Sequence, residues 1–128
     1  MSKKGTFHDL IAWQKAITLS KLVYQVSRTL PETERFGLVV QMRRAAVSVA
    51  SNIAEGNARQ SLRDYIHFLT MARGSLAELE TQLIITDQLN MLTEPTPVME
   101  ILRETRRVLQ GLIDSLRKKQ QNMQTKKT

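Results

Sequence analysis

The apolar residues of this chain recur at alternating spacings of three and four in four separate stretches, a period typical of amphipathic helices. Pro31 and the Glu94–Pro97 segment interrupt the pattern, and Ser61 is a good N-cap residue with an acid three positions later. Helices are therefore predicted from residue 8 or 9 to 30, from 33 to 56, from 62 to 86 and from 97 to 117.

In the first stretch, a stripe of larger side chains is predicted to face the core, with Trp13 as its anchor. Its members lie at helical spacing: Leu10, Trp13, Ile17, Ser20 and Tyr24, with Val23, Val26 and Leu30 widening the stripe. The second stretch is expected to end at Gly56, where a residue without a Cβ atom can adopt the left-handed cap conformation. Gly74 lies in the middle of the third helix and costs propensity there, which suggests a close helix crossing opposite it.

The second stretch has an unusual distribution of polar residues. Apolar or small residues cover most of its circumference and leave only a narrow polar seam, whereas a surface helix should be charged over much of its girth. We therefore expect this helix to be covered on several sides, with the seam at least partly enclosed. Together with two residues expected to adjoin it, the seam comprises Gln41, Arg44, Ser48, Ser51, Asn52, Glu55 and Glu78.

The connections between the predicted helices are short, so consecutive helices should be neighbours. The predicted fold is all-α, an antiparallel up-down-up-down four-helix bundle over residues 9–117. Residues 1–8 are expected to form a loose leader, and residues 118–128 a basic, disordered tail. With 128 residues the chain is long enough for one domain with a core of its own.

The formal charge of +7 is spread unevenly along the chain. Residues 1–31 carry +4 and residues 95–128 carry +5, whereas residues 32–56 sum to 0 and residues 57–94 to −2. This excess favours a polyanionic partner, above all nucleic acid, although terminal lysines often serve only solubility. The basic residues expected to contact phosphates lie on the first and fourth helices: Lys15, Lys21, Arg28, Arg103, Arg106, Arg107, Arg117, Lys118 and Lys119.

Candidate catalytic chemistry is scarce. The absence of cysteine removes disulfides, thiolate ligands and cysteine nucleophiles, and the two histidines stand apart from any Glu-x-x-His pair or serine partner. There is no glycine-rich phosphate loop, since Gly56 and Gly74 are isolated. We therefore expect no enzyme, no cofactor and no metal. Without a signal-like leader or a long apolar run, a cytoplasmic protein without membrane contact is the default expectation.

Several residues around the seam resemble the signature of the 23S rRNA-intervening-sequence protein family, small bacterial four-helix-bundle proteins. In the second helix they are Gln41, Arg43–Ala45, Ser48 and Asn52–Gly56. In the third they are Ser61, Phe68–Leu69, Ala72–Leu76 and Glu78–Thr81. The resemblance covers roughly residues 7 to 92 and implies a homopentamer of bundles. A related branch resembles the accessory proteins of diversity-generating retroelements, which partner a reverse transcriptase and its template RNA.

Three interpretations of the seam remain open at this point. It could be an intramolecular network that fixes helix register, with Arg44 meeting Glu78 or Glu80 and Glu55 meeting a nearby arginine. It could instead lie in a subunit interface. Direct ligand binding is the least favoured of the three interpretations.

Two functions are weighed. The first is a non-enzymatic homo-oligomeric adaptor, a pentamer by resemblance, that binds RNA, DNA or a ribonucleoprotein through the basic surfaces. The alternative is a protein-binding scaffold, such as a reverse-transcriptase accessory protein, whose basic faces are merely solubilising. A small-molecule-binding bundle comes third, because nothing in the regular core pattern indicates a pocket.

Overall fold

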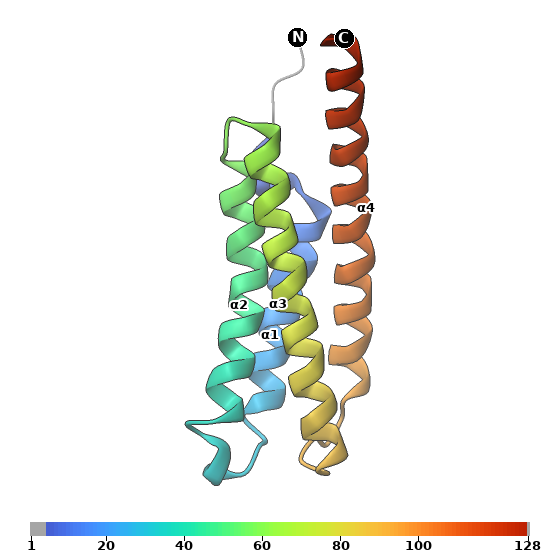
Figure 1. Cartoon of the computed structure of the whole chain (residues 1–128). Coiled ribbons are helices and arrows are strands. Elements are labelled where there is room, and N and C mark those ends of the chain that lie inside the picture. Colours follow the sequence, from blue (N-terminus) through green and yellow to red (C-terminus); the bar gives the residue numbers. More distant parts are fainter. Residues whose placement is uncertain (1–4, 128) are drawn as a thin grey trace.

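A computed structural model describes the backbone of residues 5–127 and the side chains of residues 5–125. The described chain forms four long helices, α1 (Ile11–Ser27), α2 (Leu38–Asn57), α3 (Leu62–Gln88) and α4 (Thr96–Lys127), and two single-turn 3-10 helices, η1 (Phe7–Asp9) and η2 (Glu32–Glu34). Consecutive helices run in opposite directions, and α4 returns to pack against α1 as well as α3 (Figure 1). The fold is the predicted all-α four-helix bundle.

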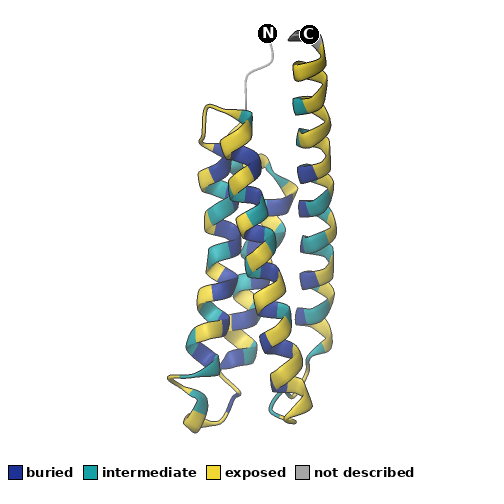
Figure 2. Ribbon diagram, in the orientation of Figure 1, coloured by how far each residue is buried: buried dark blue, intermediate teal, exposed yellow. Residues whose placement is uncertain are grey.

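The core consists of leucine, isoleucine, valine, alanine and methionine side chains along the inner faces of the helices (Figure 2). The threonines Thr86 and Thr105 are fully buried among them, and each hydroxyl donates to the carbonyl four residues earlier in its own helix, at 2.6 Å in both cases. These hydroxyls therefore occupy the apolar interior without losing their hydrogen bonds.

The face that α1 presents to the core agrees only in part with the prediction, although Val23 and Leu30 are buried as expected. Its buried residues are small as well as large: Ala12, Ala16, Leu19, Val23 and Ser27. Trp13 packs only at the edge of the core, where its ring meets those of Phe7 and His8, and Tyr24 is exposed. Alanine on the inner face lets the helices approach closely, so the larger side chains of the expected stripe are displaced toward the surface.

The ends of α3 are set by local hydrogen bonds. The backbone N–H of Asp64 donates to the Ser61 hydroxyl oxygen at 3.1 Å, as the N-cap prediction required. At the other end Asn90 takes a φ of 59°, and the N–H of Met91 reaches back to the carbonyl of Thr86 at 3.1 Å. This is a left-handed helix cap with asparagine in the place that glycine usually takes.

Both glycine predictions are wrong. Gly56 lies within α2 and has no positive φ, so it is not a left-handed cap. A Cβ atom at Gly56 would lie 2.8 Å from the Phe68 Cβ and 3.1 Å from the Tyr65 carbonyl oxygen, so the glycine permits the close approach of α2 and α3. Gly74, in contrast, faces open space and permits no close crossing.

The chain termini also depart from the prediction. Helix α4 does not end near residue 117 but continues to Lys127 and projects beyond the α2–α3 turn (Figure 1). No glycine or proline follows Gly111, and lysine, glutamine and methionine are good helix formers, so the helix continues after its apolar stripe thins. The predicted leader is ordered from residue 5 and includes η1, while residues 1–4 lie outside the described part.

Candidate nucleic-acid interface

The nine basic residues expected to bind phosphate do not form a single surface. Two of them are held by acids within the bundle: the Lys15 ammonium lies 2.8 Å from Glu104 across α1 and α4, and Arg106 lies 2.5 Å from Glu80 across α4 and α3. Their charges are partly neutralised, and their side chains link helices. The pKa of the Glu104 carboxyl is lowered, chiefly by the hydrogen bond from Lys15 and by its charge.

The remaining seven are exposed, and among the described residues none of them is in an ion pair. They are Lys21, Arg28, Arg103, Arg107, Arg117, Lys118 and Lys119. Arg103 and Arg107 are one helical turn apart and so share a face of α4. Arg107 also lies near enough to Glu104 to help to lower the pKa of that carboxyl.

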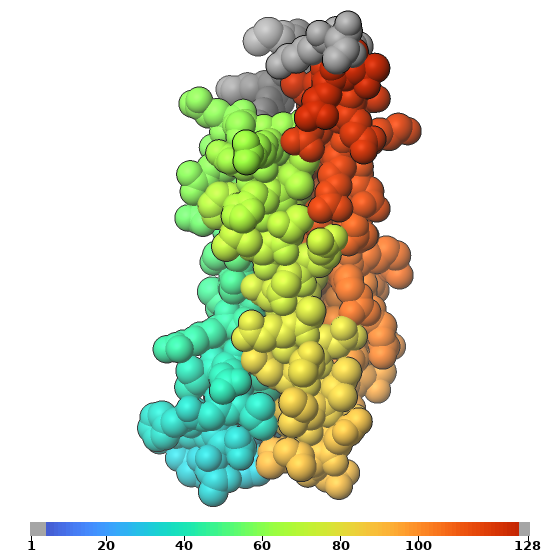
Figure 3. Space-filling view, viewed as in Figure 1, coloured from blue at the N-terminus to red at the C-terminus, as the bar shows by residue number. Residues whose placement is uncertain are grey.

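Arg103 and Arg107 form the first cationic region, and the second is the projecting end of α4. Residues 115–128 include five lysines and arginines and no acid. Lys118 and Lys119 border a shallow surface hollow together with Ser115, Asn122 and Met123. In the space-filling view this end of α4 extends above the α2–α3 turn (Figure 3). The positive charge here is accessible and has no acid on its own helix after Asp114.

The third region surrounds Tyr24 on α1 and reaches the adjoining surface of α2. Lys21 and Arg28 border a hollow of about 360 Å³ with Ile17, Ser20, Tyr24 and Gln25. Tyr24 also borders a hollow of about 550 Å³ lined by α2 residues, among them Arg43 and Arg44. Lys21 and Arg28 therefore lie apart from the fourth-helix cations, because they flank Tyr24, which also borders the arginines of α2.

Sequence reasoning assigned no binding role to Tyr24 or Arg43, although the structure places them in direct contact. The Arg43 guanidinium carbon lies 4.6 Å from the centre of the Tyr24 ring, and its Nε donates to the Ser27 hydroxyl at 2.9 Å. Ser20 also links α1 to α2, because its hydroxyl donates to the Ala46 carbonyl at 3.2 Å. The absence of acids from residues 10–31 and 35–54 was the available sequence signal.

The polar seam of α2 faces outward beside α3 and is not enclosed within one chain. Gln41, Arg44, Ser51 and Glu55 are exposed, and so is Glu78 on α3. The hydroxyls of Ser48 and Ser75 lie 2.9 Å apart, and the Asn52 amide donates to the Ser48 hydroxyl at 3.0 Å. The expected ion pairs of Arg44 and Glu55 are not among those of the described residues, and Glu80 pairs with Arg106 instead.

The α3 residues beside the seam continue it at spacings of four and three: Met71, Ser75, Glu78, Gln82 and Ile85. Met71 and Ile85 are 44% and 46% exposed, which is high for large apolar side chains. The Gln82 amide nitrogen donates to Glu78 at 3.3 Å, while its buried oxygen has no partner among the described residues. The α2–α3 face is thus the seam plus these five residues.

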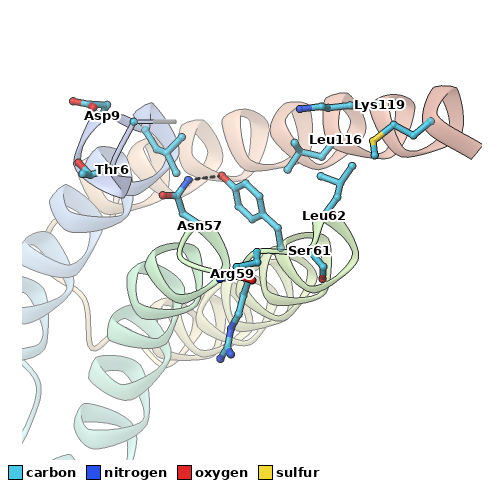
Figure 4. A pocket seen from close by; sticks show the side chains of 13 residues that line it. Thr6, Asp9, Asn57, Arg59, Ser61, Leu62, Leu116 and Lys119 are labelled. Carbon is cyan, nitrogen blue, oxygen red and sulfur yellow. Dashed lines mark hydrogen bonds between the residues drawn. The ribbon is translucent and has the colours of Figure 1, made fainter. Parts of the chain in front are cut away.

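A hollow of about 700 Å³ lies where the α2–α3 turn, η1 and the end of α4 meet (Figure 4). Leu62 and Leu116 give it an apolar wall, and Lys119 stands at its edge. The Asn57 amide donates to the Tyr65 hydroxyl at 3.2 Å, and burial raises the pKa of Tyr65 above 10.0. The core pattern gave no indication of this hollow, because it forms between helix ends rather than within the bundle.

Nowhere among the described residues do three or more histidine or acidic side chains gather as metal ligands would. None of the helices in that part of the chain combines the length and the apolar character that a membrane span requires.

Comparison with known proteins gives the chain a family. One solved structure, a protein of unknown function from the S23 ribosomal protein family of Bacteroides thetaiotaomicron VPI-5482, is similar in fold with a TM-score of 0.74. The similarity covers 81% of this chain and 96% of that one at 20% identity. No curated protein matches significantly. The model of the 23S rRNA-intervening sequence protein family matches residues 8–113, so the chain belongs to that family.

Proposed function

We propose that this protein is a non-enzymatic, homo-oligomeric adaptor that binds RNA or DNA through phosphate contacts. The observation that carries the proposal is a set of exposed basic side chains on α1, α2 and the end of α4 that, among the described residues, have no acidic partner. A formal charge of +7 on 128 residues makes association with a polyanion favourable at moderate salt. Phosphate contacts of this kind position a nucleic acid without reading its sequence.

Self-association is the second part of the proposal. The α2–α3 face combines exposed Met71 and Ile85 with small side chains that let another helix approach closely. A second copy is the occupant that we propose for it, and the family resemblance points to a ring of five. A closed ring uses two different patches on each subunit. Assembly would multiply the charge and make nucleic-acid binding multivalent.

The test of the first part is binding of a labelled RNA by the purified full-length chain, followed by fluorescence anisotropy. Saturable binding that weakens as salt is raised supports the proposal. Absence of binding at low salt contradicts it. The test of the second part is the mass in solution by light scattering, for which a lone 14.6 kDa particle at micromolar concentration is the contrary result.

A protein-binding scaffold is the alternative, and the neighbouring exposed side chains Ile85 and Leu89 near the end of α3 favour it. In that case a reverse transcriptase is one candidate partner. Capture of partners from a lysate before and after nuclease treatment separates the two functions. A partner retained after nuclease, with no affinity of the pure protein for RNA, would replace the first proposal by the second.

A further inference from the structure

We infer that the surface around Tyr24 is a binding site for single-stranded RNA, in which an unstacked base packs on the tyrosine and neighbouring cations hold the phosphates. The inference rests on the proposed function and gives it a place and a strand preference. The site is named here the Tyr24 patch, and it consists of Lys21, Tyr24, Arg28, Arg43 and Arg44.

The shape of the surface suits a strand that passes over the ring. Tyr24 is 38% exposed and borders two hollows, one with Lys21 and Arg28 along α1 and one with Arg43 and Arg44 along α2. An extended strand lying across both hollows would place its backbone near cations on either side of the tyrosine. Base stacking on an exposed aromatic ring between basic residues is the common arrangement in proteins that bind single strands.

The charge around the ring is of one sign. Helix α1 contains no acidic residue, and α2 contains none before Glu55. The nearest acids along the sequence are Glu32 and Glu34 in the connection between the two helices, and Glu32 is paired with Arg35 at 3.3 Å. Four basic side chains therefore surround Tyr24, and among the described residues none of the four is in an ion pair.

Arg43 is held in place before any ligand arrives. Its Nε donates to the buried Ser27 hydroxyl at 2.9 Å, and its guanidinium lies over the Tyr24 ring at 4.6 Å. The other guanidinium N–H groups make no hydrogen bond with described residues, so they remain available to a phosphate oxygen. A fixed guanidinium loses little entropy when it binds, which favours it as the central phosphate contact.

Tyr24 gives the patch its preference for single-stranded RNA over duplex RNA. In a duplex the base faces are stacked on one another, so an aromatic side chain on a protein surface cannot reach them. Exposed Val47, 44% accessible on α2, adds apolar surface next to the ring for the base to cover. A duplex would contact only the cations and would bind more weakly than a single strand of equal charge.

The experiment uses a labelled single-stranded oligoribonucleotide that contains 5-iodouracil, which crosslinks under light to an aromatic residue stacked on it. We expect a crosslink to the peptide that carries Tyr24. In anisotropy titrations Tyr24→Ala should lose affinity about 5- to 150-fold, the range found for removal of a stacking residue, while Tyr24→Phe should bind as the wild type does. Duplex binding should change little in either variant.

Phe36 provides a matched control. It is 86% exposed and has the Arg35 guanidinium 5.3 Å from its ring, but the acids Glu32 and Glu34 closely precede it in the sequence. Phe36→Ala should bind the single strand as the wild type does. An equal loss in Phe36→Ala and Tyr24→Ala would overturn the assignment.

Different experimental results would contradict the proposed function and the Tyr24 patch. A wild type that does not bind any RNA contradicts the proposed function. A wild type that binds in a salt-dependent way, with a crosslink elsewhere and an unchanged Tyr24→Ala affinity, overturns only the Tyr24 patch. A lower solution mass for Tyr24→Ala with unchanged RNA affinity would assign the surface to contacts between copies and would also overturn it.

Discussion

Gly56 of α2 and Phe68 of α3 lie so close that a Cβ atom added at Gly56 would be 2.8 Å from the Phe68 Cβ. The Tyr65 carbonyl oxygen, 3.1 Å from the same point, closes the other side. Neither neighbour is the free end of a flexible side chain, so neither can move without shifting α3. The most extensive helix contact of the bundle is the one between these two helices, and it needs a glycine at this position.

Gly56→Ala is therefore expected to destabilise the fold by about 1–3 kcal/mol, the usual range for overpacking. Gly74→Ala is the matched control, because a Cβ there meets nothing within 4 Å. It should stabilise the protein by about 0.5–1 kcal/mol through helix propensity alone. Urea unfolding of both variants measures the difference. Equal effects of the two substitutions would contradict the close approach of α2 and α3.

The Lys15–Glu104 contact predicts a pH dependence. Because the pKa of Glu104 is lowered from 4.5, its contribution to stability is present above that pH and is lost as the pH falls through the folded-state value. In a carboxyl-carbon NMR titration, Lys15→Gln should raise the Glu104 midpoint. Lys21→Gln removes a charge from α1 that does not contact Glu104 and should leave the midpoint in place. A midpoint that ignores Lys15 would refute the pairing.

The raised pKa of Tyr65 predicts that stability falls at high pH, the opposite of the effect expected from Glu104. Its pKa is raised above 10.0 by burial, so the stability it contributes is complete below pH 10.0 and is lost as the pH rises through the folded-state value. Tyr65→Phe removes the hydrogen bond from Asn57 and should cost about 1 kcal/mol at pH 8. The gap between wild type and variant in unfolding free energy should narrow above pH 10.0. A gap that stays constant there would exclude a buried, protonated hydroxyl.

The basic end of α4 is tested by replacing Arg117, Lys118 and Lys119 together with glutamine. The salt slope of RNA binding should become shallower by up to about 2, since each phosphate contact to a single strand contributes about 0.7. Stability should change by less than about 0.5 kcal/mol, because the three side chains are exposed. Lys15→Gln, whose ammonium is bound to Glu104, should alter the slope less. Equal changes in the salt slope for the two variants would show that the exposed end of α4 has no special part in RNA binding.

Two neighbouring isoleucines test the proposed contact between copies. Ile85 is in line with Met71 and Ser75 on the α2–α3 face, whereas Ile84, exposed to a similar extent, points away from that line. Ile85→Glu should lower the mass in solution toward that of a single chain, and Ile84→Glu should not. Loss of assembly in both variants, or in neither, would place the contact elsewhere.

The fold could be predicted from sequence because apolar periodicity, N-cap residues and helix-breaking prolines determine helices locally. Ser61 caps α3 as expected, and Pro31 follows the last turn of α1. The register of α1 could not, because Ala12 and Ala16 compete with Trp13 and Tyr24 for the inner face, and only the packing of the other helices decides between them. Side-chain size in a sequence does not reveal how close two helix axes will lie.

The candidate site was predictable only in part, for a related reason. Composition gave the excess of charge, but Lys118 and Lys119, expected in a disordered tail, lie exposed on the extended helix α4. Which neighbour each flank of α1 faces is a property of the assembled bundle. Lys21 and Arg28 therefore lie near Arg43 of α2 rather than near the cations of α4, and only the assembled bundle brings the α2 arginines to Tyr24.

The affinity of the wild-type chain for RNA should fall steeply as salt is raised, because the proposed contacts are to phosphates. Anisotropy titrations between about 50 and 200 mM salt give the logarithm of the association constant against that of the salt concentration. Binding through the exposed cations should give a straight line with a slope of about −2 or steeper for a single strand, which corresponds to three or more phosphate contacts. A flat line, or no binding at the lowest salt, would rule out phosphate contacts as the basis of binding.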